Sequence, residues 1–540
     1  MQTNVQVLWF KRDLRIQDHA ALFAAAKAGP LLPIFVWDAA IWSSPDYSTQ
    51  HVMFVRECLV ALRFDLQAIG LDLIESSDGI LNVLNYLLST QSIAALYSHE
   101  ETGNQSSYDL DREVAAWCRQ HQLSWHEYPQ NGVVRRLKTR NSWHGIWQKR
   151  MAAAQFPVPM ATLAQLANPE QLAKPAPALL YDVAAAHLQK PQADKAQRQK
   201  GGRNHALKML NSFLNGRASQ YRGGISSPIS SVTAGSRISP YLTWGVLSMK
   251  EVMQALRLQH VRIKQNPDKY PKKLDSGLIA FESRMHWHCH FMQKLESEPA
   301  IEYQNLHSAL NGIRDEAYAD ALSQQKLQAW ITGRTGWPLV DACMAMLRET
   351  GWVNFRMRAM LMSTASYLYW LHWREPGLHL AREFLDYEAG IHWPQVQMQS
   401  GTTGINTLRM YNPVKQAIDQ DPEGHFVRKW LPALSGVPTA WIFEPWLMTP
   451  ALQLQYQCII GQDYPEPMIT LASAFSHARA QLALAKPGAT HMAETKRIID
   501  KHASRKRRPA NKAKLAIGRK SAIDIEATHE NCAGVQQSLF

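Results

Sequence analysis

Two different hydrophobic periods divide the chain. Near the N-terminus, apolar runs at residues 6–10, 31–36, 71–74 and 94–98 have the length and composition of buried β-strands. Between them, residues 52–69 and 109–121 repeat their apolar positions at the spacing of amphipathic helices. This alternation predicts an α/β domain with a doubly wound parallel sheet, which binds ligands at the carboxyl ends of its strands. We place this domain at residues 1–130.

The second half of the chain has a helical period. Apolar and aromatic residues recur at helical spacing, most densely from 340 to 371, and predict consecutive buried helices. We therefore expect an all-α domain at residues 204–486. The intervening residues 131–203 are rich in Pro, Ala, Gln and Lys, and six prolines interrupt any long helix, which indicates a surface connector.

The last part of the chain, residues 487–540, is basic and poor in core residues. From 496 to 520 it carries eleven Lys or Arg residues against one acidic residue. Such a segment repels itself and has little apolar surface to bury, so we expect a disordered tail.

The composition limits the class of protein. A chain of 540 residues exceeds what one hydrophobic core usually supports, in agreement with two domains. No apolar run approaches about 18 residues, so we expect neither a membrane span nor a signal peptide, and a cytoplasmic location. Six scattered cysteines without a Cys-x-x-Cys pair disfavour a disulfide framework and a zinc or iron–sulfur site. The net charge of +13 favours a polyanionic partner over a role in solubility alone.

Two arginines and two acids stand out in the helical half. Arg356 and Arg358 follow the turn at Gly351, and Asp386 and Glu388 lie just past the next helical segment. Because a buried cation needs an anionic partner, this spacing predicts ion pairs inside the helical domain. The spacing leaves open whether these pairs are structural or belong to a ligand site.

Longer motifs add a family resemblance. Residues 335–358 contain the pattern TGxPxVDAxMxxLxxTGWxxxRxR, followed by Trp-Arg-Glu at 373–375 and Asp-Tyr-Glu at 386–388. Residues 235–248 are similar to a TSRLSPYLxxGxLS segment, and the N-terminus is similar to an opening VxWFRxDLRxxD. In this order, over roughly residues 5 to 450, the motifs resemble those of the photolyase/cryptochrome family.

The resemblance implies FAD in the helical domain. Arg358, oriented by Asp386, would stabilise negative charge on the reduced ring, because a buried guanidinium favours a nearby anion. Ser236, Arg237 and Ser239 would donate to the diphosphate. The residues that the resemblance places against the cofactor are Tyr221, Gly235, Ser236, Arg237, Ile238, Ser239, Phe281, Arg284, His288, Phe355, Arg358, Asp386, Glu388 and His392.

For a damaged base flipped out of DNA, the resemblance implies an aromatic wall at Trp287, with a core tryptophan as the alternative. Several positions depart from the enzymes that split cyclobutane dimers. Arg284 stands for a glutamate, His288 for an arginine, Asn354-Phe355 for a His-Asn pair and Ala359 for a methionine. The histidine pair of eukaryotic (6-4) photoproduct enzymes is also absent after the Gly-Trp turn.

Histidines raise two further questions. His392 falls where the family usually has an asparagine facing flavin N5, so its protonation near neutral pH would tune the redox state of the flavin. The alternative is a packed, hydrogen-bonded histidine, and the sequence does not choose. His286, His288 and His290 alternate along the chain, and a helix would spread them over different faces, so we expect no metal site.

Dimer-splitting members of the family are photoreduced through a row of three tryptophans. Trp373 matches the middle one, but the inner position is Val396 and the outer position is Asp320. The row is therefore broken here. The aromatic residues that could form another route are Trp393, Trp370, Tyr369 and Tyr318, although clustered aromatics are also typical of a core.

A second chromophore and a protein partner are also implied. Residues 100–104 (Glu-Glu-Thr-Gly-Asn) follow a strand and could receive a folate-type pterin or a deazaflavin antenna, with a helix cap as the alternative. The last residues resemble the peptide with which bacterial DNA-processing proteins dock on the sliding clamp. Leu539 and Phe540 of this peptide, which also includes Ser538, would fill an apolar pocket of the clamp, and Gln536 would fix the orientation by hydrogen bonds, unless the terminus has no function.

Together these inferences predict a monomeric, blue-light-driven DNA photolyase that splits a UV-induced pyrimidine dimer by electron transfer from reduced FAD, with Trp287, Arg358, Trp373 and His392 at the catalytic site. The alternative on the same scaffold is a cryptochrome-type photoreceptor. A third hypothesis is a basic flavoprotein that binds nucleic acid without repairing it.

Overall fold

The N-terminal domain is built on a five-stranded parallel sheet. The computed structural model describes residues 4–90, 92–163, 193–406, 408–485 and 489–503. The strands are β1 (Asn4–Phe10), β2 (Leu31–Val36), β3 (Ile74–Ser76), β4 (Ser92–His99) and β5 (Ser124–Tyr128), in the order β3-β2-β1-β4-β5. Neighbouring strands are parallel throughout. The predicted doubly wound sheet is confirmed.

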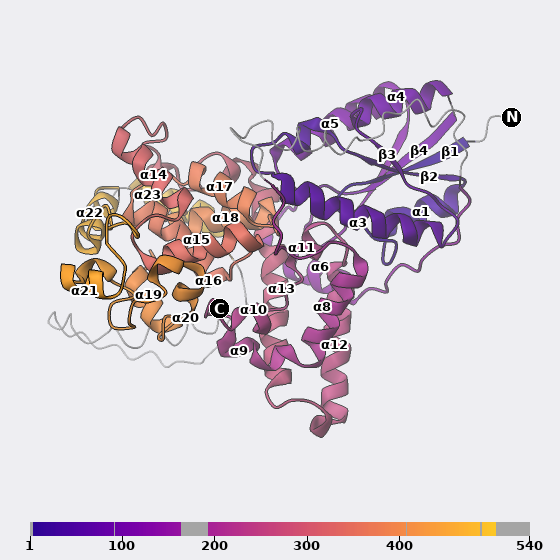
Figure 1. Cartoon of the computed structure of the whole chain (residues 1–540). Coiled ribbons are helices and arrows are strands. Elements are labelled where there is room, and N and C mark those ends of the chain that lie inside the picture. Colours follow the sequence, from indigo (N-terminus) through magenta and orange to yellow (C-terminus); the bar gives the residue numbers. More distant parts are fainter. Residues whose placement is uncertain (1–3, 91, 164–192, 407, 486–488, 504–540) are drawn as a thin grey trace, which may run out of the picture. The chain divides into compact units, whose positions relative to one another are not determined.

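Alternation along β1 explains why both faces of the sheet are covered. Val5, Val7 and Trp9 belong to a core on one face, whereas Leu8 and Phe10 belong to the core on the other. The helices α4 (Ile80–Thr90) and α5 (Gln105–Gln120) cover the first face, and α1 (Ala20–Ala28) and α3 (Thr49–Gln67) cover the second (Figure 1). The short helix α2 (Ala39–Trp42) precedes α3.

Two strands differ from the prediction. The third strand begins at Ile74, because Leu71 and Leu73 are buried in the core before the chain joins the sheet. The edge strand β5 was not predicted. It is mostly exposed and carries no continuous apolar run, so its only signal was a weak alternation around Trp125.

Part of the predicted connector is helical. Residues of α6 (Arg140–Ala152) form a regular helix whose Trp143 and Trp147 are buried. Residues 164–192, which contain four of the six prolines, lie outside the described part of the chain.

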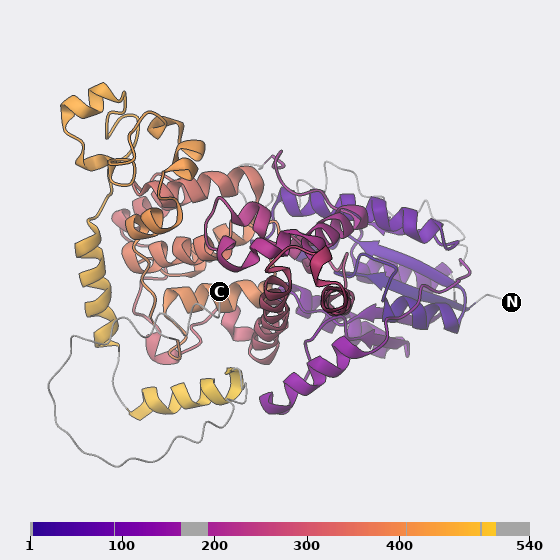
Figure 2. The same ribbon diagram turned by 90° about the horizontal axis from the view of Figure 1, so that it is seen from below.

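The remainder is helical, as predicted (Figure 2). The helices are α8 (Arg203–Asn215), α9 (Tyr221–Gly224), α10 (Ser231–Ala234), α11 (Ser239–Thr243), α12 (Met249–Gln265), α13 (Leu274–Ser297), α14 (Ala321–Thr332), α15 (Pro338–Thr350), α16 (Phe355–Ser363), α17 (Arg374–Glu383), α18 (Ala389–Ser400), α19 (Pro413–Gln420), α20 (His425–Trp430), α21 (Pro450–Gln455), α22 (Leu471–Leu484) and α23 (Ala489–His502). Short turns of helix are η2 (Arg217–Gln220), η3 (Pro267–Lys269), η4 (Pro299–Glu302), η5 (Ser308–Leu310), η6 (Thr364–Leu368), η7 (Pro432–Leu434) and η8 (Pro445–Leu447). None of the described helices is long and apolar enough to cross a bilayer.

Three of these helices form the frame for the site. α18 packs against both α13 and α16. Gly351 ends α15 with φ +66°, where a Cβ atom would come within 2.4 Å of Gln50 Oε1, so this turn requires glycine. The turn brings α16, which carries Arg358, back alongside α18.

The expectation of a disordered tail is wrong for its first part. Residues of α23 form a helix that packs against α6 and η5, and its Ile498 is fully buried (yellow in Figure 2). Glu298 explains the anchoring, because its carboxylate contacts Arg497, Lys501 and His502 at 3.2, 3.1 and 2.5 Å. Two of the basic residues that indicated disorder, Arg497 and Lys501, are here ion-pair partners. Residues 504–540, including the clamp-like peptide, lie outside the described residues.

Candidate functional site

A mostly apolar cavity of about 180 Å³ opens between α13, α16, α17 and α18. Its apolar wall includes Ala359, Met362, Leu380, Phe384 and Val396. Polar side chains also reach this cavity, among them Arg358, Asp386, His392 and Gln399, and such a mixture of apolar wall and polar groups is typical of a ligand site.

An ion pair stands at the wall of this cavity. Arg358 and Asp386 form a two-pronged contact of 2.9 and 3.1 Å, and the guanidinium lies 4.1 Å from the ring centre of Phe384. Burial would raise the pKa of Asp386, but Arg358, and then Ser239, hold it below its ordinary value. The carboxylate therefore stays charged and fixes the guanidinium beside the cavity. The spacing predicted ion pairs among these residues, and the family resemblance singled out this one.

Glu388 pairs with a residue that the sequence did not point to. Its partner is Arg12, which follows β1, at 2.7 Å; Arg12 also donates to the carbonyl of Thr243 at 3.3 Å. Arg356 instead donates to Gln416 at 3.4 Å. The sequence did contain one signal for Arg12. It lies just past the end of β1, and parallel sheets bind ligands at the carboxyl ends of their strands.

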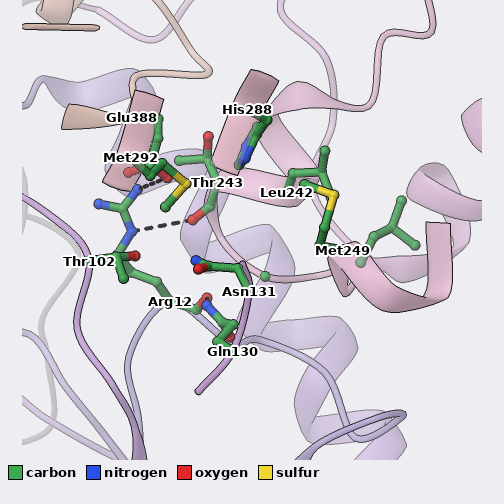
Figure 3. A pocket seen from close by; sticks show the side chains of 12 residues that line it. Arg12, Thr102, Gln130, Asn131, Leu242, Thr243, Met249, His288, Met292 and Glu388 are labelled. Atoms are coloured by element: carbon green, nitrogen blue, oxygen red, sulfur yellow. Dashed lines mark hydrogen bonds and ion pairs between the residues drawn. The ribbon is translucent and has the colours of Figure 1, made fainter. Parts of the chain in front are cut away.

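The Arg12–Glu388 pair borders a small polar cavity of about 20 Å³, in which His288, Thr102 and Asn131 also take part (Figure 3). Burial raises the pKa of Glu388 to about 7, although Arg12 opposes this shift. Thr243, His288 and Glu388 line both this space and the larger cavity. The small cavity can hold a single water molecule.

The segment predicted to receive an antenna lies at the end of β4. Thr102 borders the small cavity, which is too small for a pterin ring. Asn104 caps α5 by accepting a hydrogen bond from the backbone of Ser107, and it donates to Asp46. Asn104 therefore acts as a helix cap, which was the alternative to an antenna contact. It is buried, however, and does not lie on the surface.

The predicted diphosphate segment leads into α11. Arg237 has φ +61°, and its guanidinium lies 3.8 Å from the ring centre of Trp352. Burial lowers the pKa of Arg237 to about 10, so the side chain remains a cation at neutral pH. Arg217 holds the preceding loop by donating to the carbonyls of Gly235 and, at 3.1 Å, Ser236. A half-buried cation on a strained backbone is suited to holding an anion.

Tyr221, Phe281 and Arg284 form one cluster. The rings of Tyr221 and Phe281 lie 5.8 Å apart, and the Tyr221 hydroxyl is hydrogen-bonded to Arg284. The structure thus brings Tyr221 next to Phe281 and Arg284, which lie one turn apart on α13, and the resemblance placed all three against one ligand.

Of the four predicted site residues on α13, His288 lies at the large cavity and Trp287 does not. His288 lines the large cavity, and burial, then Arg12, lower its pKa to about 4. Trp287 is not part of that wall. Its partly buried ring contacts His290 and Phe291, with ring centres 4.8 and 5.7 Å away.

His392 lines the cavity and is also packed. Its Nε2 lies 2.9 Å from the carbonyl oxygen of Gly377, and its ring stands edge-on to Tyr387 and Trp393. Because a carbonyl only accepts, Nε2 carries the proton and Nδ1 is an acceptor. Burial lowers the pKa of His392 to about 4, which favours the neutral ring at neutral pH.

The aromatic rings of Trp393 and Trp373 follow one another next to His392. The ring centre of Trp393 lies 4.9 Å from that of His392 and 5.9 Å from that of Trp373, whose indole donates to Asn305. By contrast, the buried guanidinium of Arg314 lies over the ring of Trp370, 4.4 Å from the centre of that ring. The rings of Trp393 and Trp373 are therefore neighbours behind His392, which lines the cavity.

The fold and the site define a two-domain protein with a ligand cavity in its helical domain. A model for "DNA photolyase" matches residues 6–145, and a model for "FAD binding domain of DNA photolyase" matches residues 281–483. The chain belongs to the photolyase/cryptochrome family, and its helical domain is an FAD-binding domain.

Relatives of both kinds are similar to the chain. Cryptochrome-2 of Arabidopsis thaliana is 26% identical over 87% of this chain and 77% of its own length. Deoxyribodipyrimidine photo-lyase of Escherichia coli is 25% identical over 86% of this chain and 96% of its own length. Among solved structures, a bacterial class III photolyase from Agrobacterium tumefaciens gives a TM-score of 0.75 at 20% identity, over 90% of this chain and 98% of its own. The fold is thereby shared with that structure.

The residues present fit FAD. The Arg358–Asp386 pair, the Arg237 cation and the apolar wall supply a charge partner for the ring, an anion contact and a dry enclosure. Several buried polar atoms at the wall have no hydrogen-bond partner among the described residues, including Glu388 Oε1 and both amide atoms of Gln399. A polar ligand would satisfy them.

Proposed function

We propose that this protein is a light-driven DNA photolyase that splits UV-induced pyrimidine dimers. The observation that carries the proposal is the Arg358–Asp386 pair at the wall of a cavity within an FAD-binding domain. Reduced FAD, when bound, supplies the photoexcited electron. The net charge of +13 adds attraction to a polyanionic substrate, and relatives named as photo-lyases support repair.

The side chains of the cavity have separate tasks in this proposal. Arg358 balances negative charge on the reduced ring, and Asp386 prevents the guanidinium from turning away. His392, neutral and with its Nδ1 as an acceptor, can receive a hydrogen bond but does not release a proton at neutral pH. The apolar wall excludes water from the charged ring.

A cryptochrome-type photoreceptor is the second candidate. The departures from the enzymes that split cyclobutane dimers favour it, because Arg284 stands for a glutamate and Ala359 for a methionine at the expected lesion contacts. Relatives named as cryptochromes match over a similar share of this chain.

One experiment separates the candidates. The reduced holoprotein is illuminated with oligonucleotides that carry either a cyclobutane dimer or a (6-4) photoproduct, and lesion loss is followed against a dark control. Light-dependent loss of the cyclobutane dimer or of the (6-4) photoproduct supports repair and identifies the lesion. If neither lesion is lost while light still changes the flavin spectrum, the photolyase proposal fails in favour of the photoreceptor.

A further inference from the structure

Helix α18 carries two buried glutamines of opposite character. Gln397 is satisfied: its Oε1 accepts from the backbone of Leu306 at 2.7 Å, and its Nε2 donates to the carbonyls of Ile301 and Gln304. Gln399 is only 3% exposed, yet neither its Nε2 nor its Oε1 has a hydrogen-bond partner in the described part of the chain.

The helical period places the unsatisfied amide at the cavity. Gln395 and Gln399 lie one turn apart and share a face of α18 with His392 and Val396. All four line the flavin cavity, whereas Gln397 does not. The Oε1 of Gln395 is likewise buried without a partner among the described residues.

An unsatisfied buried amide destabilises a protein by about 1–3 kcal/mol, so its retention calls for a ligand. An amide offers two donor hydrogens and an accepting oxygen, and it needs a partner with both kinds of group. The flavin ring has carbonyl oxygens and an N–H on its pyrimidine edge. The neighbouring side chains Val396 and Met362 can provide neither.

We propose that Gln399, assisted by Gln395, hydrogen-bonds to the flavin ring and thereby sets the affinity for FAD and its reduction potential. Donation to a ring carbonyl stabilises the negative charge of the reduced ring, so Gln399 acts in the same direction as Arg358. This inference goes beyond the proposed function, because it applies whether the protein repairs DNA or senses light.

The test is Gln399→Met, which keeps the length of the side chain and removes the amide. Gln325→Met, at an exposed position of α14, is the matched control. On the holoprotein without DNA we would measure the FAD dissociation constant, the flavin absorption bands and the reduction potential. We expect Gln399→Met to bind FAD about tenfold more weakly, from one to two lost hydrogen bonds, with shifted bands and a more negative potential. The control should match the wild type.

Unchanged affinity, bands and potential in Gln399→Met would overturn the proposal. So would a variant with a normal flavin that loses only its binding to lesion DNA, since the amide would then serve the substrate. If Gln399→Met does not fold, Gln395→Met decides instead, with smaller shifts in the same direction expected. None of these measurements depends on lesion repair, so a failure of the repair proposal remains distinguishable.

Discussion

Replacing Asp386 with asparagine would remove the charge that holds Arg358 at the cavity while keeping the shape of the side chain. The pair has contacts of 2.9 and 3.1 Å, and the side chains of Arg358 and Asp386 are 21% and 6% exposed. Removing one partner of a buried pair typically costs about 3–5 kcal/mol, because the other charge is left without compensation. Since Arg358 is partly exposed and keeps the carbonyl of Val353 as a partner, we expect a loss of about 3 kcal/mol.

The assay is urea unfolding of the holoprotein, followed by circular dichroism and by release of flavin fluorescence. Asp419→Asn is the matched control, because its pair with Lys415 is exposed and 4.0 Å long. The control should stay within about 0.5 kcal/mol of the wild type. A loss below about 1 kcal/mol in Asp386→Asn would refute the reasoning.

The pH dependence gives a second check on the same pair. The folded pKa of Asp386 lies below its ordinary value, so its stabilisation is present above the unfolded pKa of about 3.9 and is lost as pH falls through the folded value. The difference in stability between wild type and Asp386→Asn should therefore narrow below about pH 4. A constant difference down to acid pH would contradict the assignment of a charged Asp386.

Three further predictions concern other parts of the chain. Trp373→Phe should slow photoreduction of the flavin, whereas Trp370→Phe should not, because Arg314 opposes positive charge on that ring; equal rates in both variants would count against the Trp393–Trp373 route. Glu298→Gln should loosen α23, with trypsin cleaving it roughly fivefold faster for a loss of about 1 kcal/mol; a resistant helix would mean that apolar packing alone holds it. Deleting residues 536–540 should abolish capture by the sliding clamp, and capture that survives the deletion would exclude the terminal peptide as the docking site.

The sequence by itself determined the two-domain plan. Continuous apolar runs predicted β1, β2 and β4, because strands buried on both faces need apolar residues at every position. Strand β5 was not predicted, because a strand at an exposed edge of the sheet does not need apolar residues at every position. The spacing of the arginines and acids predicted ion pairs within one domain, and the family resemblance selected the pair of Arg358 and Asp386.

The tertiary structure alone decided the partners that are distant in sequence. Arg12 forms an ion pair with Glu388, although 376 positions separate them in the sequence. Glu298 forms ion pairs with Arg497 and Lys501 of α23, whose charges had indicated a disordered tail. The difference between Gln397 and Gln399 is also invisible in the sequence, where both are polar residues in one helix. Periodicity reports which face of an element is buried, but whether a buried polar atom is satisfied depends on which other segment packs against that face.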